Sequence, residues 1–240
     1  MPTVFTLFSL LLLVSAVFGC THSLDARYVP AMPRLERADQ LSGIRLGIGR
    51  FEDRRRGVKA GEPETAAVIA RQGAHRWGLT YKGKEMIPIS ELVQALFVEE
   101  FGRAGIQSQA LPEVLGKGTA PAMRTAGERA GTSHVLGGNV AAFEWVNDVG
   151  MWTIDSRRAV ALEVQLARVS DGEVLLDTTA TGLDEKNEGA GIRHSTNVDQ
   201  LMNRVFRLVV FRVVEEVAQK LAMDPRDVRV HFVSGTASPR

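Results

Sequence analysis

The sequence has a single cysteine, Cys20, so no disulfide can form within the chain. It carries almost no net charge, +1 with a pI near 8.0, which excludes the strong positive field that draws proteins to nucleic acid. Aromatic residues are scarce at 6%, whereas hydrophobic residues make up 45% and charged residues 24%, as in ordinary globular proteins. We therefore predict a folded protein whose partners do not include nucleic acid.

The sequence also lacks the residue patterns of common catalytic sites. Gly47-Ile48-Gly49 and Gly137-Gly138 do not have the spacing of a nucleotide-binding loop, and no Gly-x-Ser-x-Gly elbow is present. We interpret Gly137-Gly138 as a bulge or a close approach of two backbones. The histidines form no His-x-His or His-x-x-x-His pair, and we expect each on the surface or in a structural hydrogen bond. We predict no catalytic residue, cofactor or metal ion, and hence no enzyme.

Paired carboxylates do not alter this prediction. Glu99-Glu100 and Glu215-Glu216 fall on expected helices. Neighbouring helical residues diverge by about 100°, so neither pair is placed to share one substrate. We expect both pairs on solvated helix faces.

The most distinctive feature present is an apolar run, residues 4–18, that ends at Gly19-Cys20. It is shorter than a bilayer-spanning helix, which needs about 20 residues, and has the length of a signal-peptide core. No Lys or Arg precedes it, which departs from the usual signal pattern. Val17-Phe18-Gly19-Cys20 resembles the lipobox of bacterial lipoproteins, in which the cysteine is lipidated and the chain is then cut before it. We predict a signal peptide over residues 1–19 and a lipid on Cys20.

The lipobox resemblance implies two or three acyl chains, and each buried methylene contributes about 0.8 kcal/mol to membrane binding. Thr21 stands where an Asp would resemble the inner-membrane retention signal. We therefore predict a protein anchored in the outer membrane and facing the periplasm. Residues 20–40, with Pro30 and Pro33, predict an extended tether, and residues 234–240 a disordered tail.

Residues 41–233 predict one α+β domain with the order β-α-β-α-β-β-β-α. Alternating apolar residues indicate strands, and apolar residues three and four apart indicate helices. Ser90 is the expected N-cap of the first helix, Asp171-Gly172 the expected hairpin turn, and 147–150 another turn. We expect a mixed sheet with an antiparallel three-strand meander and helices on one face. The expected strands are 44–51, 106–111, 133–145, 157–169, 174–181 and 228–233; the expected helices are 90–105, 119–130 and 197–221, and 58–88 is irregular with a short hairpin.

This order, together with the lipobox, resembles outer-membrane lipoproteins of the YajG type. It also resembles auxiliary lipoproteins of ABC transporters, curli-secretion lipoproteins and lipoprotein activators of penicillin-binding proteins. The resemblance implies a non-catalytic accessory role with a protein partner in the envelope, and it leaves homo-oligomer formation open. The matching stretches are 44–54, which ends in Asp53-Arg54, 92–107, 160–177 and 197–221.

The most basic local feature is the run Arg54, Arg55 and Arg56. It belongs either to a solvated loop or to a contact with an anion or the membrane surface near the tether, where each basic residue adds about 1 kcal/mol. Asp53 is expected to pair with Arg54 or Arg55, or to cap the turn after the first strand.

Large apolar residues gather around the expected turn at 147–150. They are Phe143, Trp145, Met151 and Trp152. Exposed aromatic residues are typical of interfaces. These side chains either cap the sheet or form a tip that contacts a partner or an acyl chain.

The sequence leaves two functions open. The first is a lipid-anchored accessory module that docks onto an envelope complex through a sheet edge or the loop from Trp145 to Trp152. The alternative is a lipid- or small-ligand-binding auxiliary component of an ABC-type transport system, with an apolar molecule held between sheet and helices.

Overall fold

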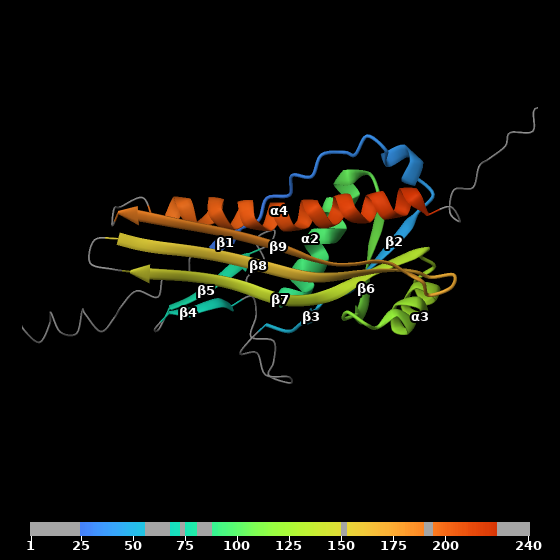
Figure 1. Cartoon of the computed structure of the whole chain (residues 1–240), viewed down its shortest axis with the longest axis horizontal. Helices are drawn as coiled ribbons and strands as arrows, with labels where there is room; N and C mark the ends of the chain where they lie inside the picture. Colours follow the sequence, from blue (N-terminus) through green and yellow to red (C-terminus); the bar gives the residue numbers. More distant parts are fainter. Residues whose placement is uncertain are drawn as a thin grey trace, which may run out of the picture.

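A computed structural model gives the fold of residues 25–55, 68–72, 75–80, 88–149, 153–189 and 194–224 (Figure 1). The predicted signal peptide and Cys20 lie outside these described residues, as do Arg56, Met151 and Trp152. The same is true of the strand predicted at 228–233 and the predicted tail.

A six-stranded mixed sheet forms the centre of the molecule, with the strand order β6-β2-β7-β8-β9 and β3 paired with β7. β2 is parallel to both of its neighbours, whereas β7, β8 and β9 form an antiparallel meander. The predicted α+β class and element order are confirmed. The strands are β2 (Arg45–Arg50), β3 (Glu52–Asp53), β6 (Gln107–Val114), β7 (His134–Val149), β8 (Thr153–Arg168) and β9 (Val174–Gly189).

Helices cover both faces of this sheet. α2 (Ile89–Ala104) and α4 (His194–Met223) pack against one face, in a core that includes Leu136 and Val140 of β7. α3 (Ala120–Ala130) packs against the other face, where Met123 meets Val135. Successive strand residues point to opposite faces, so Val135 needs its own cover. The expectation of helices on one face therefore holds for α2 and α4 but is wrong for α3.

The meander is longer than the sequence predicts. Asn147 pairs with Ser156 and Val149 with Ile154, so the turn expected at 147–150 is wrong and the strand continues. β9 likewise runs to Gly189, beyond the end expected at residue 181. Cross-strand pairing sustains these extensions although their composition is polar.

The ends of the first long helix and of the second hairpin follow from local chemistry. α2 begins at Ile89 directly after Pro88, and Ser90 is buried rather than acting as the N-cap. Gly105 ends the helix with a φ of 93°, and Gly172 forms the predicted hairpin turn with a φ of 76°. Glycine adopts this left-handed region at little steric cost.

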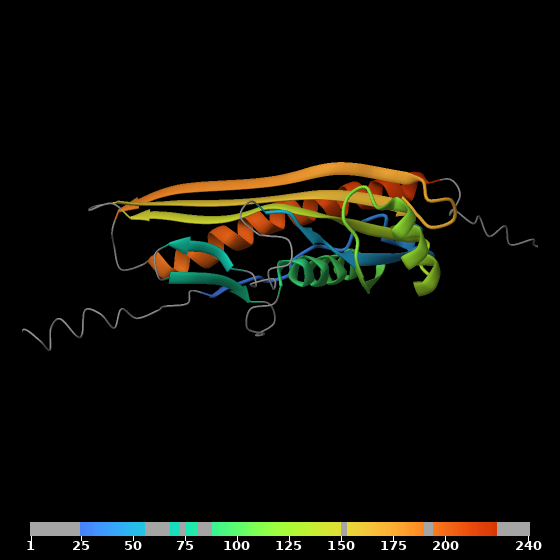
Figure 2. The same ribbon diagram turned by 90° about the horizontal axis from the view of Figure 1, so that it is seen from below.

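A smaller sheet lies beside the main one, with the order β1-β5-β4 (Figure 2). β1 (Asp25–Arg27) is parallel to β5 (His75–Thr80), and β4 (Val68–Gln72) is antiparallel to it. β4 and β5 form the short hairpin expected within 58–88.

The described part of the predicted tether belongs to the folded domain. Tyr28, Met32 and Leu41 are buried in the main core, and a short 3-10 helix, η1 (Ala38–Leu41), precedes β2. We call residues 28–41 the strap. Because burial of large side chains fixes the strap on the domain, residues 28–40 do not form the extended tether that their prolines predict.

Gly137 and Gly138 lie beside Leu115, the residue that directly follows β6. The backbone N–H of Gly138 donates to the carbonyl oxygen of Leu115 at 2.7 Å. A Cβ atom on Gly138 would meet the Glu163 carbonyl oxygen at 2.0 Å and the Phe51 ring at 2.7 Å. The close backbone approach that the sequence predicts is confirmed here.

Gly138→Ala is expected to destabilise the protein by at least about 1–3 kcal/mol, because a new methyl group has no space between fixed backbone atoms. Gly102→Ala in α2 is the control, since no atom lies within 4 Å of its Cβ position, and it should stabilise by about 0.5–1 kcal/mol. Urea unfolding of both variants measures the difference. Equal stabilities would contradict the close approach.

Candidate functional site

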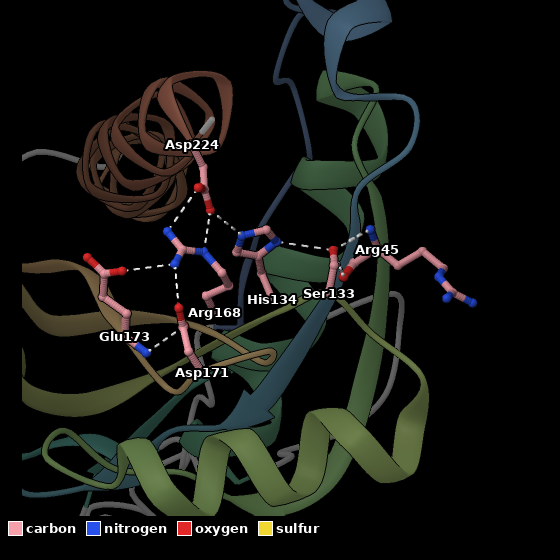
Figure 3. Close-up of polar contacts among 7 residues, drawn as sticks. All are labelled: Arg45, Ser133, His134, Arg168, Asp171, Glu173 and Asp224. Carbon is pink, nitrogen blue, oxygen red and sulfur yellow. Dashed lines mark hydrogen bonds and ion pairs between the residues drawn. The ribbon is translucent and has the colours of Figure 1, made fainter. Parts of the chain in front are cut away.

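A buried polar network occupies the end of the molecule where β7 begins, β8 ends and α4 ends (Figure 3). His134 and Arg168 are cross-strand partners, and Asp224 directly follows α4. Their exposed fractions are 0%, 5% and 4%. The network therefore joins the first and second strands of the meander to the end of the helix that covers them.

Arg168 is the centre of this network. Its Nε donates to Asp224 Oδ2 at 2.6 Å and its Nη2 to Oδ1 at 2.9 Å, the two-pronged geometry of a strong guanidinium–carboxylate pair. Its Nη1 also donates to Asp171 Oδ2 and to Glu173 Oε2, each at 2.8 Å. The bond to Asp224 raises the pKa of Arg168, burial opposes this, and Glu173 and Asp171 raise it further. The guanidinium is therefore charged and held from three directions.

His134 has protein contacts at both ring nitrogens. Nε2 lies 3.3 Å from Asp224 Oδ2, and Nδ1 lies 3.1 Å from Ser133 Oγ. Ser133 Oγ also lies 3.1 Å from both the backbone N–H and the carbonyl oxygen of Arg45. The Ser133 hydroxyl donates its single proton to the Arg45 carbonyl oxygen, and the His134 ring lies between Ser133 Oγ at Nδ1 and Asp224 Oδ2 at Nε2.

The residue types of this network are those of a serine–histidine–aspartate triad, but their arrangement differs. In a hydrolase the aspartate orients the histidine and offsets its developing charge. Here Asp224 already neutralises Arg168, and the Ser133 hydroxyl is engaged with the Arg45 backbone. His134 is fully buried, so no substrate atom can approach its ring. The geometry fastens three elements together.

A second buried carboxylate, Glu100 of α2, holds the strap. It accepts hydrogen bonds from the Tyr28 hydroxyl at 2.5 Å and from the backbone N–H groups of Ala31 at 3.0 Å and Met32 at 2.9 Å. Burial raises the pKa of Tyr28, and the bond to Glu100 raises it further. The solvated position predicted for Glu100 is wrong, because residue 100 lies four positions after Leu96 and shares its buried stripe.

α4 holds the strap as well. The Val29 N–H donates to Asn203 Oδ1 at 2.8 Å, and Nη2 of Arg207 donates to the Val29 carbonyl oxygen at 2.8 Å. The strap is thus bound to α2 and α4 through its main chain.

Arg54 and Arg55 directly follow β3 and pair with the two acidic residues of that strand. Asp53 receives Nε of Arg55 at 2.8 Å and Nη2 at 2.6 Å, which confirms the predicted pairing of Asp53. Nη2 of Arg54 donates to Glu52 at 2.9 Å. The charges of Arg54 and Arg55 are therefore balanced locally, and the anion or membrane contact of the run stays a prediction.

The large apolar residues predicted to gather around positions 147–150 do not all occupy one place in the structure. Phe143 is buried, with its ring centroid 5.0 Å from that of Phe206. Trp145 lies in β7, paired with Arg158. The side chain of Trp145 lies outside the described set, as do Met151 and Trp152, so the docking tip also stays a prediction.

Arg158 is a buried charge that the sequence analysis missed. It is fully buried, and this burial lowers its pKa to about 9, with a smaller opposing effect from Asp184. The signal was present, because residue 158 lies in phase with Val160 and Leu162, which face the helices.

The described residues were also searched for metal-binding clusters and for membrane-spanning helices. Across the described ranges, no cluster of three or more His, Cys, Asp or Glu side chains has the geometry to hold a metal ion. None of the helices in these ranges combines the length and apolar character needed to cross a bilayer.

Asp224→Asn is expected to destabilise the protein by about 2–4 kcal/mol, because it leaves the buried Arg168 without its main counter-charge. Asp171→Asn is the matched control: Asp171 bonds the same guanidinium but is one-third exposed, so its loss should cost less than about 1 kcal/mol. Urea unfolding at neutral pH compares the two variants. A smaller effect at Asp224 than at Asp171 would show that the buried pair does not fasten α4.

Comparison with known proteins yields structural matches only. No family model and no curated protein matches the sequence. A Xanthomonas campestris protein of the family model DUF330 has 12% identity and a TM-score of 0.45, over 81% of this chain and 94% of that chain. Lipoprotein GNA1162 from Neisseria meningitidis has 13% identity and a TM-score of 0.36, and the match covers 73% of this chain and 99% of that chain. The PelC dodecamer from Paraburkholderia phytofirmans has 13% identity and a TM-score of 0.32, and the match covers 75% of this chain and 93% of that chain. These values limit the likeness to general architecture.

Proposed function

We propose that this chain is a bacterial envelope lipoprotein, anchored through Cys20 in the outer membrane and facing the periplasm, that acts as a non-catalytic accessory module of an envelope complex. The observation that carries the proposal is the position of the only cysteine, one glycine after an apolar run of signal-peptide length. A lone thiol in an oxidising compartment is otherwise a liability, and lipidation consumes it.

The polar networks support a non-catalytic role. His134 is fully buried, and both of its nitrogens contact protein atoms. Buried charges that are satisfied inside a domain stabilise its shape, whereas catalytic groups need access to a substrate. Ser133, His134 and Asp224 therefore act as structural residues in this proposal.

The edge strand β9 is the surface that we assign to the protein partner. Among the described residues, β6 and β9 are the edge strands of the main sheet, but β6 contains Pro112, which lacks the N–H needed for a regular ladder. β9 is 16 residues long and contains no proline. A long edge of this kind is a template for an added strand from a partner.

The anchoring half of the proposal is tested by mass spectrometry of the protein extracted from membranes. Wild type should have lost residues 1–19 and gained acyl chains on Cys20, whereas Cys20→Ala should carry no lipid. Thr21→Asp is the control for destination, because it should keep the lipid but shift the protein toward the inner-membrane fraction. An unmodified Cys20 in membrane-derived wild type would refute the lipoprotein assignment.

The docking half is tested by affinity capture from gently solubilised envelopes. The double variant Thr179→Lys with Thr181→Lys places charge on exposed positions of β9 and should abolish capture of the partner. The matched variant Gln107→Lys with Gln109→Lys adds the same charge on exposed positions of β6 and should leave capture intact. Loss of the partner with both variants, or with neither, would sink the assignment to β9.

A further inference from the structure

The strap and the edge strand β9 contact opposite sides of α4. The backbone of Val29 bonds to Asn203 and Arg207. β9 packs against Val205 and Val209. Successive residues of an α-helix are rotated by about 100°, so these two pairs of α4 residues point about 160° apart. α4 therefore separates the strap from β9.

β1 lies on the strap side of α4. It directly precedes Tyr28, the first residue of the strap, and it contacts α4 as well as pairing with β5. Figure 2 shows the start of the described chain, in blue, and β9, in orange, on opposite sides of α4. The described chain thus begins on the side of the domain that is away from β9.

The predicted anchor is close to β1 along the chain. Cys20 precedes Asp25 by five residues (25 − 20), and five residues span at most about 18 Å when fully extended. Packed layers of secondary structure lie about 10 Å apart, so β9 lies about 20 Å from β1 with α4 between them. If β9 lay against the membrane, β1 would be too far from it for a lipid on Cys20 to reach the bilayer.

The strap keeps this reach short. Tyr28 and Met32 are buried, and Glu100 accepts hydrogen bonds from the Tyr28 hydroxyl and the Met32 N–H. Residues 28–41 therefore add no length to the connection with the lipid unless buried contacts are broken. The connection consists of the few residues that precede β1.

We infer that the lipid anchor, β1 and the strap orient the domain at the membrane, with the strap side of α4 toward the lipid and β9 facing the periplasm. The inference rests on the proposed lipid on Cys20. It also specifies the kind of partner, because a segment that adds to β9 must approach from the periplasm and not from within the lipid. The orientation follows from chain length and packing.

The test compares two exposed apolar residues at the same level of α4. Val29 on the strap is 52% exposed and Leu183 on β9 is 56% exposed. Gly182 faces α4, and successive strand residues point to opposite faces, so Leu183 points away from the helix. Lipidation converts the sulfur of Cys20 to a thioether, so a cysteine introduced by Val29→Cys or Leu183→Cys is the only thiol.

Each variant is labelled with a fluorescent donor in the lipidated protein, on vesicles whose lipid headgroups carry an acceptor. Energy transfer should be stronger from position 29 than from position 183, because position 29 lies nearer the membrane. Equal transfer, or stronger transfer from position 183, would overturn the inference. Mass spectrometry of the same samples separates the two proposals: an unmodified Cys20 refutes the anchor as well, whereas equal transfer from lipidated protein refutes the orientation alone.

The matched control lengthens the connection. Insertion of about 20 Gly and Ser residues between Thr21 and His22 adds an average reach of about 25 Å, which lets the domain turn over. The difference between the two labelled positions should then be lost. A difference that persists would show that attraction between the domain and the lipid sets the orientation, and it would overturn the role of the short connection.

Discussion

The packing of α4 on the meander is the interaction on which the rest of the structure depends. Eight valine, phenylalanine and alanine side chains between Val205 and Ala218 are buried, and they face the even-numbered residues of β8 such as Val160, Leu162 and Val164. Burial of each large side chain contributes roughly 1.5–3 kcal/mol, so this interface makes a large contribution to the stability of the domain. Gly182 of β9 permits this contact, because a Cβ there would lie 3.0 Å from the Val205 carbonyl oxygen.

Buried charged residues fix the position of α4 relative to the strands on which it packs. Apolar packing fixes the distance between α4 and the sheet, but it restricts sliding of the helix along its own axis less strictly. A two-pronged guanidinium–carboxylate pair has a defined geometry and therefore restricts that sliding. Asp224 meets Arg168 where the apolar stripe ends, and the strap is bound to Glu100, Asn203 and Arg207 farther along the helices. The polar contacts thus determine which parts of the chain stay together, and the apolar contacts supply most of the stability.

Periodicity predicts the elements of this fold because each of them has one apolar face. The valine stripe of α4 and the alternation in β8 are examples, and the turn at Asp171-Gly172 follows from backbone chemistry. Periodicity fails where a partner far along the chain decides the structure. The extension of β7 to Val149 depends on β8, and Ser90 loses its predicted capping role because Pro88 starts the helix earlier.

Polar contacts are likewise predictable from the sequence only when the two partners are close along the chain. Asp53 and Arg55 are two residues apart, so the sequence could pair them. His134 and Asp224 are 90 residues apart (224 − 134), and nothing in a single sequence links them. Glu100 and Arg158 are intermediate cases, because each lies in phase with an apolar stripe, and a charged residue in such a stripe marks a buried interaction whose partner only the fold reveals.

The strap has a mechanical consequence. Its main chain is bonded to α2 through Glu100 and to α4 through Asn203 and Arg207, and these two helices carry the same core. Force applied to the N-terminal end of the strap is therefore shared between two helices and does not peel a single strand from an edge. Hydrogen bonds loaded together along their length resist shear far better than bonds broken one after another. The domain can therefore keep its structure when its N-terminal end is placed under load.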